Sequence, residues 1–241
     1  MSDVPWPASR RQIDLAGERL RDWWLDSRLS SDLVHTDPQL SPAADLALDF
    51  RAGFQLPVSK TAMGLRSFVS RESSRVIVSQ RLKRMPTIMD KLGRYPNMKL
   101  SRMEDIGGCR ALLPGGASEI HRVVRRIRRN WQVARYRDYI AEPKATGYRA
   151  VHLIVNRDGR LIEIQLRSPA QQWWAAEVDR IASQLGAHIK DGDGPEALTR
   201  FLKLLADRVA LKESSGGAET FPEETEFQSL WPQVRVFFEE R

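Results

Sequence analysis

Hydrophobic and polar residues alternate along residues 161–167, in the second half of the chain. Successive side chains of a strand point to opposite faces, so one face of this segment should be apolar and the other polar. The polar face carries Glu163, Gln165 and Arg167. An apolar run at 151–155 precedes this segment, and the turn signal Asp158-Gly159 lies between the two runs. The pattern predicts an antiparallel hairpin that presents a carboxylate, an amide and a guanidinium on one face.

A helical period is clear in residues 118–130. Apolar residues stand at positions i, i+3, i+4 and i+7, which predicts one buried helix face. These residues are Ile120, Val123, Val124 and Ile127. Arginines follow the same spacing on another face, at Arg122, Arg125, Arg126 and Arg129. Because like charges at this spacing repel one another, we interpret this stripe either as a solvated face or as a contact for an anion such as a nucleic acid.

The other elements follow from the same reasoning. We expect helices over residues 7–29, 42–50, 59–71, 74–92, 169–185, 196–212 and 222–241, the last interrupted near Pro232, and strands over 106–113 and 131–136. Pro86 should break or kink the helix predicted over 74–92, because proline removes a backbone donor. In the segment 169–185, Trp173 and Trp174 are expected in the core.

The last segment, 222–241, is rich in aromatic and aliphatic residues. These are Phe227, Leu230, Trp231, Val234, Phe237 and Phe238. Such a face is too apolar to stay solvated. It should therefore dock on the rest of the chain, on another subunit or on a protein partner.

Composition limits the function classes. The chain has 241 residues, of which 41% are hydrophobic, which is enough for a substantial core. Its apolar runs are short and its start lacks the features of a signal peptide, so we expect no membrane span and a cytoplasmic location. Cys109 is the one cysteine, and the histidines show no zinc-ligand spacing, so a metal would be held by oxygen. The net charge of +7 favours polyanionic partners such as nucleotides or nucleic acid.

Several short phrases point to a known family. They are Arg81-Leu82-Lys83 with Thr87-Ile88 and Lys91, Asp105-Ile106-Gly107-Gly108-Cys109-Arg110, Asp138-Tyr139-Ile140 with Lys144 and Gly147-Tyr148-Arg149, Glu163-Ile164-Gln165-Leu166-Arg167, and Trp174-Ala175. In this order and spacing, the segment from about Arg75 to Gln184 resembles the synthetase domain of the RelA/SpoT homologues, and in particular the small alarmone synthetases. One departure is at Val178-Asp179, where the family usually has an acidic residue and then histidine, so we leave both residues out of the predicted site.

The resemblance implies a fold and a domain organisation. We expect an α+β fold, in which helices flank a nucleotidyltransferase-like mixed sheet of about five strands. A synthetase domain at residues 74–195 would lie between helical extensions at 1–73 and 196–241. The implied reaction is magnesium-dependent transfer of pyrophosphate from ATP to the ribose 3′-hydroxyl of GDP or GTP, which makes the alarmone (p)ppGpp.

The resemblance also implies roles for single residues. Glu163 would be the general base, and Asp105 and Glu163 would hold Mg²⁺, which prefers oxygen ligands. On the ATP side, Arg81 would stack on adenine, and the phosphates would contact Lys83, Lys91 and Arg110. On the acceptor side, Tyr148 would stack on guanine, with Lys144, Arg149, His152 and Gln165 close to the acceptor.

Two alternatives stay open for the function. A toxic subgroup of small synthetases transfers pyrophosphate to the 3′ end of tRNA and blocks translation, and the arginine stripe and the net charge of +7 favour this acceptor. The other alternative is an inactive RNA- or nucleotide-binding module, against which the presence of Asp105 and Glu163 argues. The sequence has no adjacent His-Asp pair like that of the family's hydrolase domain. We therefore expect a separate antagonist, either a hydrolase or a neutralising antitoxin protein. Whether the chain forms a homo-oligomer stays open.

Overall fold

The computed structural model describes residues 5–27, 41–72, 75–186, 189, 192–215 and 219–239. Its centre is a sheet formed by β1 (Ile77–Leu82), β2 (Gly107–Leu112), β3 (Val133–Asp138), β4 (Val151–Arg157) and β5 (Arg160–Arg167). The strand order is β1-β2-β5-β4-β3. Strands β2 and β5 are parallel and the other neighbours are antiparallel. The predicted α+β fold with a mixed five-stranded sheet is confirmed.

The hairpin of β4 and β5 forms as predicted. Its turn residues, Asp158 and Gly159, have φ values of 52° and 75°. Two positive φ values in succession are typical of the tight turn that matches the twist of antiparallel strands. Nζ of Lys60 donates a hydrogen bond of 2.8 Å to the carboxylate of Asp158 and so connects the turn to the helix that carries Lys60. This turn sets the register that places alternate residues of β5 on opposite faces of the sheet.

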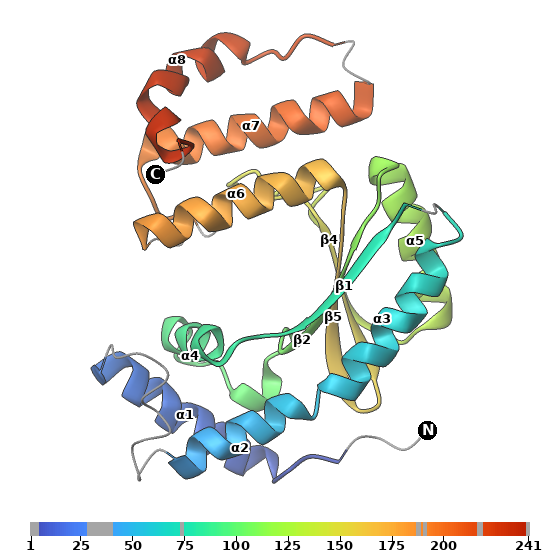
Figure 1. The fold of residues 1–241 in the computed structure, drawn as a ribbon, viewed down its shortest axis with the longest axis vertical. Helices are drawn as coiled ribbons and strands as arrows, with labels where there is room; N and C mark the ends of the chain where they lie inside the picture. The colour runs from blue at the N-terminus through green and yellow to red at the C-terminus, as the bar shows by residue number, and fades with distance from the viewer. Residues whose placement is uncertain are drawn as a thin grey trace.

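Helices α3 (Gln55–Val69) and α5 (Gly116–Asn130) cover one face of the sheet, as Figure 1 shows. The apolar face predicted for α5 is buried, as are Ile162, Ile164 and Leu166 of β5. Where α3 crosses β2, a Cβ added to Gly107 would lie 2.5 Å from Cγ2 of Val58, so only glycine allows this approach. Helices α1 (Arg10–Ser27), α2 (Ser41–Ala52) and α4 (Met85–Arg94) and the short helix η2 (Leu100–Arg102) pack at one end of this core.

The prediction of one helix over residues 74–92 is wrong in its first half. Residues 77–82 form β1, which pairs antiparallel with β2 at the edge of the sheet. The β-branched residues Val76, Ile77 and Val78 favour a strand, and they outweigh the helical pattern that we assigned. Pro86 does not break a helix: it lies in the first turn of α4, where its missing donor costs no hydrogen bond.

Helices α6 (Pro169–Leu185), α7 (Glu196–Ser215) and α8 (Glu224–Val234) form a second layer, followed by the short helix η4 (Arg235–Phe237). Ser168 and Gln171 form a capping box at the start of α6, and Gly186 ends the helix with φ of 62°. Trp174 is buried as expected, but Trp173 is 49% exposed, so its prediction as a core residue is wrong. Consecutive residues of a helix point about 100° apart, which is enough to place these adjacent tryptophans on different faces.

The aromatic C-terminal segment docks on the chain itself. Phe227 of α8 stacks on Phe201 of α7, with ring centroids 4.5 Å apart, and Val234 is fully buried. Pro232 lies inside α8 and leaves the helix intact to Val234. Within the described residues, no helix is both long enough and apolar enough to cross a membrane.

Candidate active site

A cavity of about 930 Å³ opens on the face of the sheet opposite α3 and α5, between α4 and α6. Most of its lining groups are cationic or hydrogen-bonding. The predicted site residues that line it are Arg81, Lys83, Lys91, Asp105, Arg110, Lys144, Tyr148, His152, Glu163 and Gln165. Ten residues that are up to 84 positions apart in the sequence thus share one cavity. Arg149 is the predicted site residue that does not line it.

Asp105 lies just before β2 and is held by two lysines. Nζ of Lys83 and Nζ of Lys91 each lie 2.9 Å from its Oδ2. Burial raises the pKa of Asp105, but the charges of the two lysines outweigh burial and hold that pKa below its usual value of 3.8. The carboxylate is therefore ionised at neutral pH, and both lysines already face an anion.

Glu163 lies on β5, on the polar face that the alternation predicted. Its Oε1 lies 3.0 Å from Nδ1 of His152, and its Oε2 accepts a hydrogen bond of 2.8 Å from Gln165. Burial raises the pKa of Glu163, but the hydrogen bonds that it accepts from His152 and Gln165 lower it, so the pKa lies below its usual value of 4.5. Both oxygens of an ionised carboxylate are thereby oriented toward fixed neighbours.

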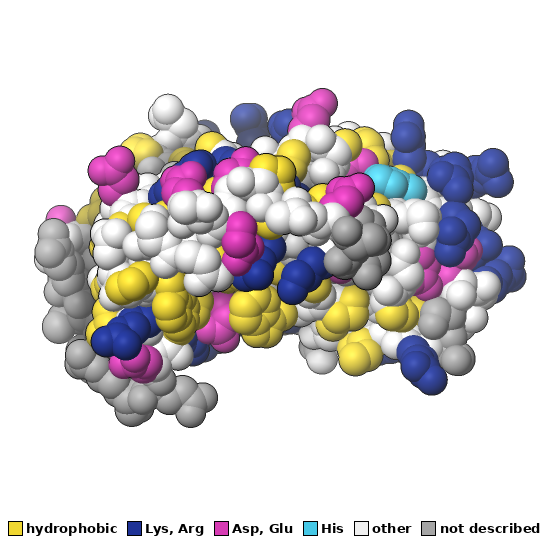
Figure 2. All heavy atoms as spheres, turned by 90° about the horizontal axis from the view of Figure 1, so that it is seen from above, with side chains coloured by type: hydrophobic (Ala, Val, Ile, Leu, Met, Phe, Trp, Pro, Cys, Tyr) yellow, Lys and Arg dark blue, Asp and Glu magenta, His cyan; other side chains and the backbone are white. Residues whose placement is uncertain are grey.

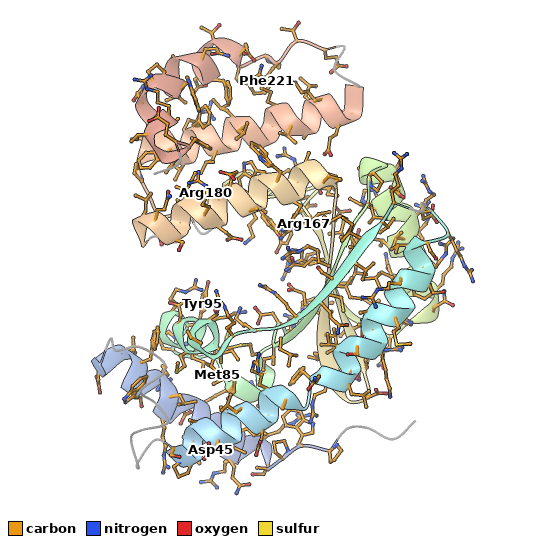
Figure 3. The ribbon with its side chains drawn as sticks, viewed as in Figure 1. Asp45, Met85, Tyr95, Arg167, Arg180 and Phe221 are labelled. Atoms are coloured by element: carbon orange, nitrogen blue, oxygen red, sulfur yellow. The ribbon has the colours of Figure 1, made fainter. Side chains whose placement is uncertain are left out.

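The hydrogen bonds continue from Glu163 through His152 to Tyr148 and Arg167. Nε2 of His152 lies 2.6 Å from the hydroxyl of Tyr148, which accepts a bond of 2.6 Å from Arg167. Arginine has only donors, so the hydroxyl proton of Tyr148 is available to Nε2, and the imidazole donates from Nδ1 to Glu163. Figure 3 shows Arg167 beneath α6, beside the sheet. The chain links the carboxylate to the tyrosine ring across β4 and β5.

The ring of Tyr148 is almost fully buried, at 5% exposure. It packs edge-on against Tyr139 and His152, with centroids 5.7 Å away in both cases. Nζ of Lys144 lies 5.5 Å from the centroid of Tyr148 and 5.6 Å from that of Tyr139. A base that stacks on this pair of rings would meet the ammonium of Lys144, which is exposed and long enough to move.

Arg81 and Arg110 stand on the neighbouring strands β1 and β2 and line both the main cavity and a small pocket that adjoins it. Burial and the nearby charges of Arg167 and Arg81 lower the pKa of Arg110. Nε of Arg110 is buried without a hydrogen-bond partner among the described residues. An anion or a polarisable base between these guanidinium groups would offset that cost.

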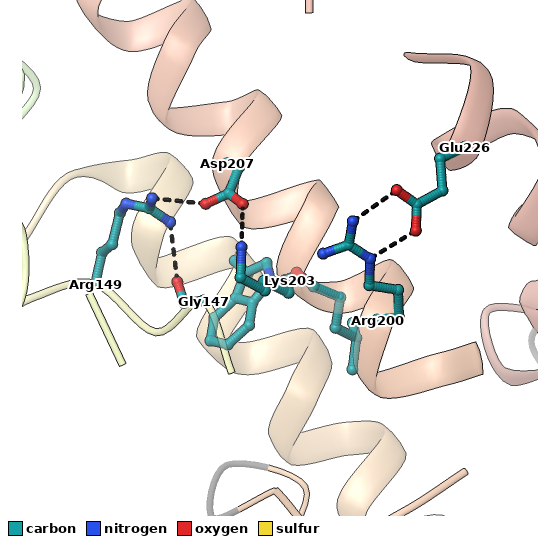
Figure 4. Close-up of polar contacts among 8 residues, drawn as sticks. Gly147, Arg149, Arg200, Lys203, Asp207 and Glu226 are labelled. Carbon is teal, nitrogen blue, oxygen red and sulfur yellow. Dashed lines mark hydrogen bonds and ion pairs between the residues drawn. The ribbon is translucent and has the colours of Figure 1, made fainter. Parts of the chain in front are cut away.

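Arg149 points away from the cavity, toward α7. Its Nη2 donates to Asp207 at 2.8 Å and its Nη1 to the carbonyl of Gly147 at 3.1 Å, as Figure 4 shows. Asp207 also accepts a bond from Lys203. Arg149 therefore connects the loop before β4 to α7. It can affect the acceptor side only by holding in place the loop that carries Tyr148.

Some cavity residues were not among those predicted for the site. They are Leu82, Arg84, Thr87, Arg94, Tyr139, Arg167, Asp179, Ala182 and Ile189. The two-residue period of β5 already placed Arg167 on the same face as Glu163, so the sequence held that signal. Asp179, which the departure from the family pattern led us to leave out, has its side chain at the cavity and close enough to affect the pKa of Arg110.

The residues present fit a magnesium ion. Asp105 and Glu163 supply carboxylate oxygens to the same cavity, and Oδ1 of Asp105 is buried without a hydrogen-bond partner among the described residues. Magnesium is usually held by one or two carboxylates together with substrate phosphates. In the part of the chain that the structure describes, no group of three or more His, Cys, Asp or Glu side chains could hold a metal by itself. A site completed by phosphates agrees with that finding.

Comparison with known proteins finds a matching family and several relatives. Residues 80–182 match the family described as "Region found in RelA / SpoT proteins". The GTP pyrophosphokinase YjbM of Bacillus subtilis is 34% identical over 110 residues, which cover 41% of this chain and 52% of that protein. This chain spans about half the length of the first curated relatives that it matches.

Two solved structures share the fold. Small alarmone synthetase 2 of Bacillus subtilis has a TM-score of 0.55 and 26% identity, and the match covers 68% of this chain and 90% of that one. Small alarmone synthetase 1 of the same organism, bound to its product pppGpp, has a TM-score of 0.56 and 25% identity and covers 68% and 92%.

Proposed function

Because residues 80–182 match the RelA/SpoT family, we propose that this chain is an ATP-dependent pyrophosphokinase of that family. It transfers pyrophosphate from ATP to the ribose 3′-hydroxyl of GDP or GTP, with Mg²⁺ as cofactor, and makes (p)ppGpp. We also propose a cytoplasmic location, because these nucleotide substrates are found in the cytoplasm. The names of its relatives, GTP pyrophosphokinase and small alarmone synthetase, support this activity.

One observation carries the proposal. Two partly buried, ionised carboxylates, Asp105 and Glu163, face a single cavity whose other walls carry lysines and arginines. Transfer of a phosphoryl group needs a base for the attacking hydroxyl and cations for the charge on the phosphates. Both requirements are met within the same 930 Å³.

The reaction can be written with these residues. The 3′-oxygen of the acceptor bonds to the β-phosphorus of ATP, the bond from that phosphorus to the α–β bridging oxygen breaks, and AMP leaves. The hydroxyl proton passes to Glu163, which Gln165 and His152 hold in place. Asp105 and Glu163 would hold Mg²⁺, which supplies charge neutralisation at the phosphates when bound.

On the donor side, Arg81 would lie on the adenine and Arg110 would contact the phosphates. Lys83 and Lys91 reach the phosphates after leaving Asp105. This exchange keeps each lysine paired with an anion before and after ATP binds, so no bare ammonium is buried.

On the acceptor side, Tyr148 would carry the guanine, with Lys144 displaced from the rings toward the acceptor phosphates. His152 and Gln165 would position the ribose, since both already bond Glu163. Arg149 would act only indirectly, by holding the tyrosine loop to α7.

The 3′ end of tRNA is the second candidate acceptor, and the net charge of +7 favours it. In that case the protein would act as a translation-blocking toxin, and a neutralising antitoxin protein would be required. A module that binds nucleotides without transfer is the remaining alternative. The two intact carboxylates argue against it, since an inactive module has no need for them.

Labelled ATP decides between these acceptors. The protein is incubated with γ-labelled ATP and Mg²⁺, and with GDP, GTP or bulk tRNA in separate reactions. We expect label in the guanine nucleotides, and we expect Tyr148→Ala to abolish most of it because the base platform is lost. If only tRNA becomes labelled, tRNA is the acceptor and GDP and GTP are not. No transfer to any of the three, with ATP still bound, would leave the binding module as the function.

A further inference from the structure

A second, smaller cavity lies on the far side of the sheet from the candidate active site, where α5 packs beside the end of α3. Its volume is about 380 Å³. It is lined by Phe68, Arg71, Glu72, Arg122, Arg125, Arg126, Arg129 and Asn130, which we call the arginine groove. Figure 2 shows Lys and Arg side chains gathered at the end of the molecule where Figure 1 places α5. Five arginines face one glutamate in the groove.

The four stripe arginines of α5 are not equivalent. Glu72 lies 2.7 Å from Nε of Arg122 and 3.0 Å from Nη1 of Arg126, and it is 10% exposed. Arg126 also donates to the carbonyl of Phe68. The hydrogen bond from Arg122 lowers the pKa of Glu72 by more than burial raises it. The carboxylate of Glu72 is therefore ionised inside the groove. The inner pair of arginines thus shares one carboxylate, which offsets one of their two positive charges.

The outer arginines of the groove are left open. Arg71, Arg125 and Arg129 are exposed, and among the described residues no carboxylate lies within ion-pair distance of them. Arg125 and Arg129 stand one helical turn apart on α5, and like charges at this spacing destabilise a helix. An anion that spans successive turns of α5 would relieve this repulsion.

We infer that the arginine groove binds the phosphate backbone of a nucleic-acid strand, outside the active site. The stripe repeats its charge along the helix axis, which suits a partner with regularly repeated charges. Arginine forms paired hydrogen bonds to phosphate oxygens, and binding releases the counterions of the strand. The apolar ring of Phe68 forms one wall against which a sugar or base can lie.

The groove is separate from the reaction centre. The side chains of Glu163 and Gln165 project from β5 on the cavity side, whereas α3 and α5 cover the opposite side of the same strand. A strand in the groove therefore needs no contact with the catalytic carboxylates. This site holds nucleic acid whether the acceptor is a mononucleotide or tRNA, and it does not depend on the proposed reaction.

Glu72 sets the affinity of this site. Its carboxylate occupies the position between Arg122 and Arg126 that a phosphate would take, so the strand must compete with it. Replacing Glu72 by glutamine keeps the size of the side chain and removes the competing charge. The groove then offers two more arginines to the strand.

The test measures binding of the full chain to fluorescent single-stranded RNA and DNA oligonucleotides of matched sequence, by anisotropy over a range of salt concentrations. The double variant Arg125→Glu/Arg129→Glu should weaken binding on the order of tenfold or more. Each single-strand phosphate contact adds about 0.7 to the slope of log affinity against log salt, so this slope should become shallower by about 1.4. The variant Glu72→Gln should bind more tightly than the unchanged protein.

The matched control is Arg11→Glu/Arg19→Glu, which makes the same change of charge at exposed positions of α1. This control should bind like the unchanged protein, apart from a small uniform loss. If both double variants weaken binding equally, only net charge acts and the groove is not the site. Failure of the unchanged protein to bind either oligonucleotide would also overturn the inference. Polyglutamate that competes as well as RNA, in a manner that depends on Arg125 and Arg129, would assign the groove to an acidic protein instead. Tighter RNA than DNA binding, or the reverse, identifies the strand.

Discussion

Replacing Glu163 by glutamine removes the proposed base while keeping the shape of the side chain. In the structure both carboxylate oxygens accept hydrogen bonds, from His152 and from Gln165. Glutamine has one acceptor oxygen, so one of these two bonds is lost at a cost of about 1 kcal/mol. The variant should therefore fold and should bind ATP and the acceptor.

The loss of transfer should be much larger than this structural cost. Removing a positioned general base lowers the rate by a factor of about 10² to 10⁴, which corresponds to about 3–5 kcal/mol in the activation barrier. Because the pKa of Glu163 lies below its usual value of 4.5, the base is ionised throughout the neutral range, so its titration should not change the transfer rate of the unchanged protein near neutral pH.

The assay follows transfer of γ-label from ATP to GDP, with kcat and KM measured separately. We expect kcat to fall and KM to change little. Glu177→Gln is the control, since this carboxylate also lies on an element beside the cavity but pairs with Arg180 and does not line it. If Glu163→Gln keeps more than about a tenth of the normal kcat, the role of Glu163 as base is wrong.

Four further predictions concern the neighbouring residues. Asp105→Asn should raise the Mg²⁺ concentration needed for half-maximal transfer, and an unchanged requirement would remove Asp105 from the proposed metal site. Asp105 also predicts a pH effect: its lowered pKa means that its ion pairs stabilise the fold fully above pH 3.8 and less as the pH falls through the folded-state pKa. The difference in unfolding free energy between the unchanged protein and Asp105→Asn should therefore shift in favour of the variant in acid, as urea titrations at several pH values would reveal. Tyr148→Phe should lower the free energy of unfolding by about 1–3 kcal/mol, because buried Arg167 loses its hydroxyl acceptor; equal urea midpoints would contradict the hydrogen-bond chain. Gly147→Ala should cost on the order of 1–3 kcal/mol, since φ at Gly147 is +90° and a Cβ there would lie 2.8 Å from that of a residue on α7; calorimetry of the two proteins would measure this loss.

Local periodicity in the sequence predicted much of the secondary structure and the faces on which key side chains lie. The two-residue period of 161–167 predicted the strand and the face that carries Glu163, Gln165 and Arg167, and the helical period of 118–130 predicted the buried face of α5. These are properties of a few consecutive residues, because backbone geometry alone places alternate side chains of a strand, or every third or fourth residue of a helix, on one side. The resemblance to the RelA/SpoT family added the proposed roles of the ten predicted site residues that line the cavity.

Only the tertiary structure decided how distant residues meet. Lys83 and Lys91 turn toward Asp105, Arg149 turns toward Asp207 on α7, and Glu72 enters the arginine stripe of α5. The sequence placed residues 77–82 in a helix, whereas pairing with β2 makes them a strand. In each case the outcome depends on which partner packing brings within hydrogen-bond reach, since a long charged side chain has many rotamers of similar energy until a buried counter-charge selects one.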